Sequence, residues 1–129
     1  MKFFRPFFRT SAAHHSLINQ RTGVTVAATV VTAFDSASRR RGLLGLAAMP
    51  AGQAMIIAPS NAIHTWSMQF AIDVAFITRT GRIVKIQSNL PPRRIAASFG
   101  AFAVIELASG TLEACQTTTG DTVSLVAHA

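Results

Sequence analysis

An apolar run between residues 63 and 76 carries the chain's single Trp together with a His and an Asp, the side chains best suited to chemistry. The ring of His64 changes charge near neutral pH, so it is a candidate general base or metal ligand. Asp73 stands between Ile72 and Val74, where a carboxylate must be hydrogen-bonded, paired or at the mouth of a pocket, because an unpaired buried charge is costly. These residues predict either a polar recognition site or buried polar side chains whose hydrogen bonds are satisfied within the fold.

Each of these side chains also has a structural interpretation. A lone His in an apolar strand is more often packed with one satisfied nitrogen, and a short Asp side chain often caps a turn through backbone amides. Trp66 and Met68 are spaced at period two, which predicts that both lie on one face of a strand. Such a pair is usually core, although a Trp next to a His can also form the floor of a ligand pocket. The residue types leave both interpretations open.

Glu106 is a second carboxylate in apolar surroundings. It alternates with Val104 and Phe102 along a predicted strand, so it points inward if they do. A buried Glu needs a partner. If burial raises its pKa or that of Asp73, either group becomes suited to acid or base chemistry assisted by His64.

Nucleophilic and metal chemistry receive less support. The chain has one Cys, Cys115, which excludes an internal disulfide and a Cys-based zinc site. Neither Ser67 nor Cys115 lies in a nucleophile elbow or beside a predicted base. His14 and His15 are neighbours in an irregular segment, where adjacent side chains rarely converge on one ion. We therefore predict no metal and no cofactor.

Length and charge limit the function classes. The chain has 129 residues, half of them apolar, which predicts one folded domain. Residues 1 to 41 hold seven of the 12 basic residues and one of the five acidic ones, which leaves five and four for the remainder. Since the remainder is near neutral, we expect nucleic-acid or anionic-surface contact, if any, through the basic tail.

No apolar run reaches the roughly 20 residues of a membrane span, and Arg5, Pro6 and Arg9 interrupt any export signal. The cytoplasm is the expected compartment.

The elements that position these residues are mostly strands. Residues 1 to 21 have no period and are expected to be a flexible basic tail, with the domain at 22 to 129. A helix capped by Asp35 is predicted at 36–44, and Thr111 is expected to cap a one-turn helix. The strongest local prediction is a hairpin of 74–78 and 82–87 with Gly81 at positive φ. The other predicted strands are 24–30, 54–57, 63–65, 102–107 and 122–126. The fold class is α+β, mostly β: a compact barrel or sandwich of six to seven short strands with one short helix on one side.

The order of the motifs resembles a known family, domain of unknown function family 192. The match covers residues 24 to 126 and rests on Arg41-Gly42-Leu43-Leu44-Gly45, Met49-Pro50, the block from His64 to Phe76, Gly81, Pro91, Val104-Ile105-Glu106-Leu107 and Gly120-Asp121. The chain departs from the common pattern at Ala37 and Ser38, where acidic residues usually open the helix, and from His64 to Met68. The family occurs in bacteria and archaea, sometimes behind an export signal, so the periplasm is an alternative compartment. The resemblance implies a small β-rich fold and supplies no activity, substrate or cofactor.

Three hypotheses follow. The first is a non-enzymatic binding domain whose cleft takes a small polar ligand. Arg41, the cation that the family resemblance matches, is the candidate partner of Glu106, either in a structural ion pair or in a shared recognition site for that ligand. The candidate lining of this cleft is Arg41, His64, Trp66, Met68, Asp73 and Glu106. The second is an enzyme that uses Asp73 or Glu106 in acid or base chemistry. The third is an interaction module that contacts nucleic acid or an anionic surface through its basic tail.

Overall fold

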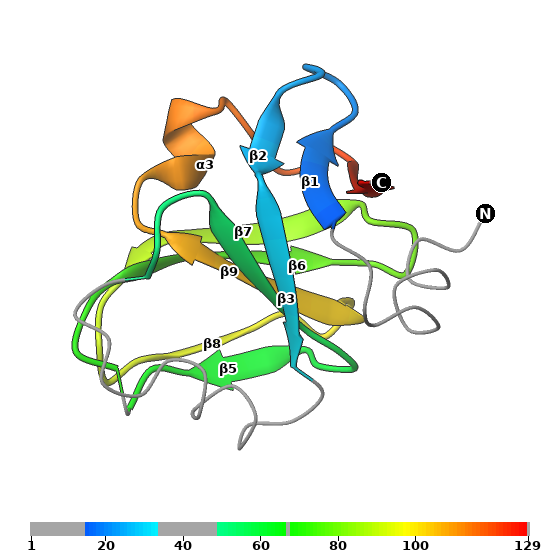
Figure 1. Ribbon diagram of the computed structural model, residues 1–129. Helices are drawn as coiled ribbons and strands as arrows, with labels where there is room; N and C mark the ends of the chain where they lie inside the picture. The colour runs from blue at the N-terminus through cyan, green and yellow to red at the C-terminus, as the bar shows by residue number, and fades with distance from the viewer. Residues whose placement is uncertain (1–14, 34–48, 67, 129) are drawn as a thin grey trace.

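The computed structural model describes residues 15–33, 49–66 and 68–128, and within them the chain forms ten strands and one short helix (Figure 1). The elements are β1 His15–Asn19, β2 Thr25–Ala27, β3 Thr29–Ala33, β4 Gln53–Ile57, β5 Ala62–His64, β6 Ile72–Ile77, β7 Ile83–Leu90, β8 Ile95–Ala97, β9 Ala103–Ala108, α3 Thr111–Ala114 and β10 Val123–Ala127. The expected mostly β fold with a short helix is confirmed. The helix predicted at 36–44 lies outside the described residues.

A five-stranded sheet of order β3-β4-β9-β6-β7 forms the centre of the domain. Strands β3 and β4 are parallel, and the other neighbouring pairs are antiparallel. All six residues of β6 are buried. A strand covered on both faces needs apolar side chains in both directions, which explains why β6 reads as a nearly continuous apolar run.

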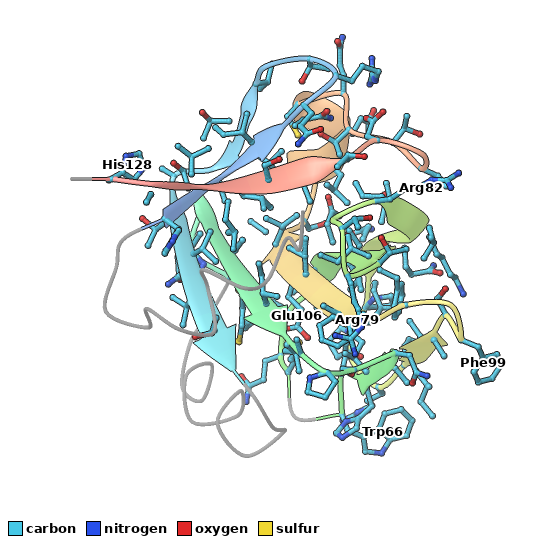
Figure 2. All side chains as sticks on the ribbon, turned by 90° about the vertical axis from the view of Figure 1, so that its right-hand side faces the viewer. Trp66, Arg79, Arg82, Phe99, Glu106 and His128 are labelled. Atoms are coloured by element: carbon cyan, nitrogen blue, oxygen red, sulfur yellow. The ribbon has the colours of Figure 1, made fainter. Side chains whose placement is uncertain are left out.

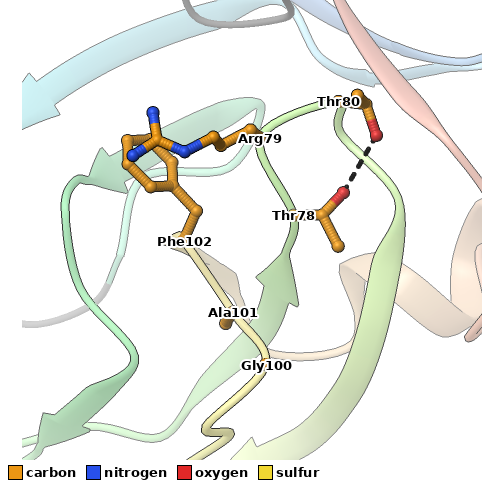
Figure 3. A pocket seen from close by; sticks show the side chains of 6 residues that line it. All are labelled: Thr78, Arg79, Thr80, Gly100, Ala101 and Phe102. Carbon is orange, nitrogen blue, oxygen red and sulfur yellow. Dashed lines mark hydrogen bonds between the residues drawn. The ribbon is translucent and has the colours of Figure 1, made fainter.

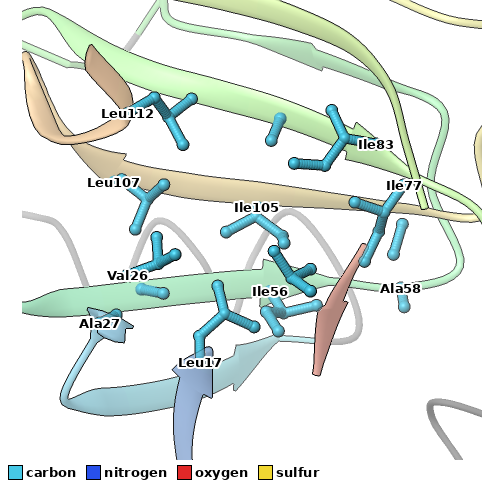
Figure 4. Close-up of a cluster of buried hydrophobic side chains, with 14 residues drawn as sticks. Leu17, Val26, Ala27, Ile56, Ala58, Ile77, Ile83, Ile105, Leu107 and Leu112 are labelled. Carbon is cyan, nitrogen blue, oxygen red and sulfur yellow. The ribbon is translucent and has the colours of Figure 1, made fainter. Parts of the chain in front are cut away.

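Two hydrophobic clusters fill the two sides of the central sheet. On the first face, β10, β1 and β2 form a three-stranded sheet, and α3 packs beside it (Figure 1). Leu17, Ile56, Ile105, Leu107 and Leu112 meet there (Figure 4). On the second face, the two-stranded ribbon of β5 and β8 covers the sheet. The described part of the domain is therefore layered, and the sheets found in it do not close into a barrel.

The hairpin predicted around Gly81 is confirmed. Gly81 has a φ of 89°, its N–H donates to the Thr78 carbonyl at 3.0 Å, and the Thr78 N–H donates to the Arg82 carbonyl at 2.9 Å. Left-handed φ values of this kind strain residues that have a Cβ. The turn thus fixes the register of β6 on β7.

Three elements differ from the sequence-based expectation. The strand predicted at 24–30 is interrupted at Ala28, so that β2 joins the three-stranded sheet and β3 joins the central one. Strand β8 was not predicted. Residues 15–19, expected to belong to a tail ending at residue 21, form β1, which pairs with both β10 and β2. Its Leu17 side chain is 1% exposed, so these residues contribute to the core.

A buried polar cluster ties β1 to the Gly120-Asp121 turn. The Asn19 side-chain amide donates to the Asp121 carboxylate at 2.9 Å, and the Arg21 guanidinium forms an ion pair with it at 2.7 Å. The Thr118 N–H donates to the same carboxylate at 3.0 Å. The pKa of Asp121 is held well below its usual range, and the hydrogen bond from Arg21 is the largest cause of this lowering.

Candidate functional site

Asp73 lies on the first face of the central sheet and is fully buried. Its Oδ1 accepts the Asn89 N–H at 2.9 Å, and its Oδ2 accepts the Leu112 N–H at 3.0 Å. These backbone amides come from the end of β7 and from the first turn of α3. The carboxylate therefore joins three elements through main-chain hydrogen bonds, in the manner of a capping group.

Glu106 lies on the opposite face of the same sheet. It is fully buried, and its register neighbours are Met55 on β4 and Val74 on β6, both members of the second hydrophobic cluster. Side chains alternate across a strand, so Asp73 and Glu106 point away from each other through the sheet. The structure does not bring the two carboxylates to one site.

The β5–β8 ribbon positions the residues around His64. Ile63 and Ala96 point inward to the second cluster, while His64, which is half buried, pairs with the exposed Ile95 on the outer side. Thr65 is fully buried after the ribbon ends. Sequence reasoning gave Thr65 no role, although it stands inside the family-matched block.

Thr65 fixes the loop that follows β7. Its hydroxyl donates to the Pro91 carbonyl at 2.7 Å and accepts the Arg94 N–H at 2.9 Å. Its backbone N–H donates to the Arg94 carbonyl at 2.8 Å, and its carbonyl accepts the N–H groups of Arg93 and Met68. Two loops distant in sequence are thereby held in one arrangement.

The turn after Thr65 separates Trp66 from Met68. Trp66 is 60% exposed and points away from the domain, whereas Met68 is buried in the second cluster (Figure 2). The period-two prediction placed both on one strand face, but the chain leaves the strand at Thr65 and reverses there. Among the candidate residues, Met68 and Glu106 share the second face, and Arg41 lies outside the described residues.

A surface depression of about 460 Å³ lies where the β6–β7 turn meets the segment before β9. The Arg79 guanidinium lies 4.0 Å above the centre of the Phe102 ring (Figure 3). The wall of the depression also contains Thr78 and Thr80, whose hydroxyl oxygens are 3.0 Å apart. Gly100 and Ala101 complete the lining. A second depression of about 270 Å³ shares Ala101 and Phe102.

Sequence reasoning missed Arg79 and Phe102 as a pair. They are brought together by the antiparallel register of β6 and β9, in which Ile77 pairs with Ala103 and accepts the Phe102 N–H at 2.8 Å. Residues just beyond such a pair become neighbours across the sheet end. No signal local to either residue indicates this contact.

The surface is more basic than the residue count indicates. Of the four acidic residues that the structure describes, Asp73, Glu106 and Asp121 are buried, and Glu113 is exposed. All six described cations are exposed. Arg21 is paired with Asp121, and within the described residues the other five, Arg79, Arg82, Lys85, Arg93 and Arg94, have no carboxylate partner. The folded body therefore presents a cationic exterior.

Two features are absent from the described part of the chain. No three or more His, Cys, Asp or Glu side chains there converge as a metal-binding group. No helix in those same ranges has the length and apolar character needed to cross a membrane.

Residues 17–125 match the sequence profile of the DUF192 family, described as "Uncharacterized ACR". The match spans most of the chain, and the protein belongs to this family. No curated protein matches the chain.

Two solved structures share the fold. One is a "putative transcription regulator" from Sinorhizobium meliloti, with a TM-score of 0.74 and 25% sequence identity, covering 88% of this chain and 92% of its own. The other is a protein of unknown function from Novosphingobium aromaticivorans, with a TM-score of 0.70 and 19% identity, covering 86% of this chain and 83% of its own.

Proposed function

We propose that this domain is a non-enzymatic binding module for a small anionic ligand, held in the depression around Arg79 and Phe102. The main support for this proposal is the stacking of the Arg79 guanidinium 4.0 Å above the centre of the Phe102 ring. Stacking restricts the Arg79 side chain before any ligand arrives, so less conformational entropy is lost on binding. The guanidinium edge remains available, since Arg79 makes no hydrogen bond within the described residues.

The lining indicates the class of ligand. A guanidinium recognises carboxylates and phosphates through paired N–H donors, and the hydroxyls of Thr78 and Thr80 lie on the same wall. A volume of about 460 Å³ lies within the usual range for small-molecule sites. The proposal keeps the small polar ligand expected from sequence and makes it an anion.

The cleft first expected from sequence receives less support from the geometry. Its members diverge: Asp73 and Glu106 occupy opposite sheet faces, and Trp66 points outward. The enzyme hypothesis, in which Asp73 or Glu106 acts as an acid or base, receives less support for Asp73. Both Asp73 oxygens already accept backbone N–H groups, which leaves that carboxylate committed to the fold.

DNA reading also receives less support, although one structural neighbour is described as a "putative transcription regulator". Readers of the major groove commonly insert a helix of several turns. The helix in the described part of the chain, α3, has four residues. The third hypothesis, contact through the basic tail, concerns residues 1–14, which lie outside the described ranges, and residues 15–19, which form β1.

Thermal unfolding of the full chain tests the proposal. Inorganic phosphate, citrate and nucleoside phosphates are compared with neutral sugars, because a ligand that binds only the native state raises the melting temperature. At a concentration of about 100 Kd the stabilisation is about 2.7 kcal/mol. We expect one or more anions to raise the melting temperature of the wild type and no effect of the sugars.

The matched variants are Arg79→Gln and Arg82→Gln. Both positions are exposed on the same hairpin, but Arg79 lines the depression and Arg82 does not. Arg79→Gln should abolish the anion-dependent shift, while Arg82→Gln should retain it. An equal shift in both variants, or no shift with any anion in the wild type, contradicts the proposal.

A further inference from the structure

Three large apolar side chains, which we call the docking face, are exposed on or beside the β5–β8 ribbon: Trp66 just beyond β5, Ile95 on β8 and Phe99 just beyond β8. They are 60%, 72% and 93% exposed, respectively. In Figure 2, Trp66 projects from the lower edge of the domain and Phe99 from its lower right-hand edge. The other exposed large apolar residues of the described chain, Val24 and Val126, belong to the three-stranded sheet or its turn. Clustered exposure of this kind marks interaction surfaces more often than scattered exposure does.

Hydrogen bonds hold these side chains outward. Phe99 lies in a turn closed by the Ala101 N–H donating to the Ser98 carbonyl at 3.0 Å, and the Ser98 N–H donates to the Asn61 carbonyl at 2.8 Å. Trp66 directly follows the buried anchor Thr65. Ile95 lies opposite His64 in the ribbon. Ile95 therefore lies in paired backbone, and hydrogen-bonded residues stand next to Trp66 and Phe99 in sequence.

Cations border the docking face. Arg93 and Arg94 directly precede Ile95, and both are exposed. The Lys85 ammonium donates to the Ala97 carbonyl of β8 at 2.8 Å, which places this charge at the edge of the ribbon. The exposed acid among the described residues, Glu113, belongs to α3, which packs at the other face of the central sheet. The border of the docking face is thus positive without a nearby described carboxylate.

We propose that the docking face binds the surface of an anionic lipid bilayer. Trp side chains favour the region between headgroups and acyl chains, and Phe and Ile side chains gain free energy when they leave water there. The bordering Arg and Lys side chains complement lipid phosphates. The aliphatic side chain of Ile95 fits acyl chains better than bases, which stack on flat rings. The anion-binding depression has a different lining, which contains neither Trp66 nor Phe99, although its lining residue Gly100 directly follows Phe99.

The full chain carries its own reporter of this binding, because Trp66 is its single Trp. Phosphatidylcholine vesicles are compared with vesicles that also contain phosphatidylglycerol, by co-sedimentation and Trp emission. We expect binding and a blue shift of the emission with the anionic vesicles, both weakened by salt. Co-sedimentation without a blue shift would assign the contact to another surface, such as the basic tail, and overturn the proposal.

Matched substitutions sharpen the test. The double variant Ile95→Ser, Phe99→Ser should lower the partition coefficient by at least about tenfold, because two apolar groups no longer enter the bilayer. Val126→Ser changes an exposed apolar residue of β10 and should leave binding unchanged. Arg93→Gln and Arg94→Gln should each weaken binding by about fivefold. Far-UV circular dichroism confirms that the variants fold.

Two further results would overturn the proposal. The first is equal partitioning of the wild type and the Ile95→Ser, Phe99→Ser variant. The second is a blue shift with a single-stranded oligonucleotide but none with anionic vesicles, which would assign the docking face to nucleic acid. Arg79→Gln separates the two proposals, since it should remove the small-anion response and leave the Trp66 emission shift with vesicles intact.

Discussion

At the residue scale, Asp73 and Glu106 show how far sequence reasoning extends. The apolar neighbours of each residue correctly predict burial, and a cap through backbone amides was one interpretation of Asp73. The identity of its partners was not predictable, since the Asn89 and Leu112 amides are 16 and 39 residues away. Their opposite faces follow from a register between β6 and β9 that only the fold determines.

Asp73→Asn is expected to destabilise the domain by about 1–3 kcal/mol, because an amide group can replace one acceptor but turns a donor toward the other buried N–H. Urea unfolding measures the loss. Glu113→Gln is the control, since that exposed side chain should change stability by less than about 0.5 kcal/mol. Unchanged stability of Asp73→Asn would contradict the capping role.

Asp121 predicts a pH dependence of stability. Its pKa in the folded state is held below the unfolded value of about 3.9, chiefly by the hydrogen bond from Arg21. The ionised carboxylate therefore stabilises the fold above that value, and this contribution is lost as the pH falls from about 4 toward the folded pKa. Asp121→Asn should cost about 1–2 kcal/mol at pH 7, allowing for the half-exposed Arg21 side chain.

Unfolding free energies of the wild type and Asp121→Asn, measured between about pH 7 and pH 3, check this linkage. The difference between the two curves should be constant above about pH 5 and should shrink as the pH falls from about 4 toward 3, without vanishing, because the folded pKa lies lower still. A constant difference across the range would mean that the ionisation of Asp121 does not stabilise the fold.

At the element scale, local pairings were predicted from sequence and distant ones were not. The β6–β7 hairpin is encoded by two β-rich runs around one glycine, and it is confirmed. Strand β1 has little alternation of its own, and its partner β10 lies more than 100 residues away. Strand β8 is three residues long and exists through its pairing with β5. The contact between Arg79 and Phe102 belongs to the same class of distant pairing.

Gly81→Ala should destabilise the hairpin and with it the domain by about 1–2 kcal/mol, because a Cβ is strained at the φ of 89°. Gly100→Ala is the matched control: its φ is not in the left-handed region, and a Cβ there meets nothing within 4 Å. Chemical denaturation compares the two. Equal stability of the variants would show that the turn tolerates a side chain and that the strain argument fails.

At the scale of the whole molecule, the layered fold separates charge in a way that composition does not reveal. From residue 42 onward the sequence has five basic and four acidic residues, which predicted a near-neutral body. Folding buries three of the four described carboxylates in or beside the core and leaves the cations outside. Both proposals depend on this separation, because anions and anionic surfaces meet the exterior.

The extent of the domain is the last whole-molecule prediction. Residues 15–19 form the central strand of the three-stranded sheet, and this strand carries buried Leu17 and Asn19. A chain of residues 22–129 loses that strand, leaves β10 and β2 without their shared neighbour, and removes the Asn19 and Arg21 partners of Asp121. A chain of residues 15–129 keeps every described strand. We expect a cooperative unfolding transition in the longer chain and none in the shorter one, measured by circular dichroism during heating. If the shorter chain unfolds at the same temperature as the longer one, β1 is dispensable, and the domain begins after residue 21.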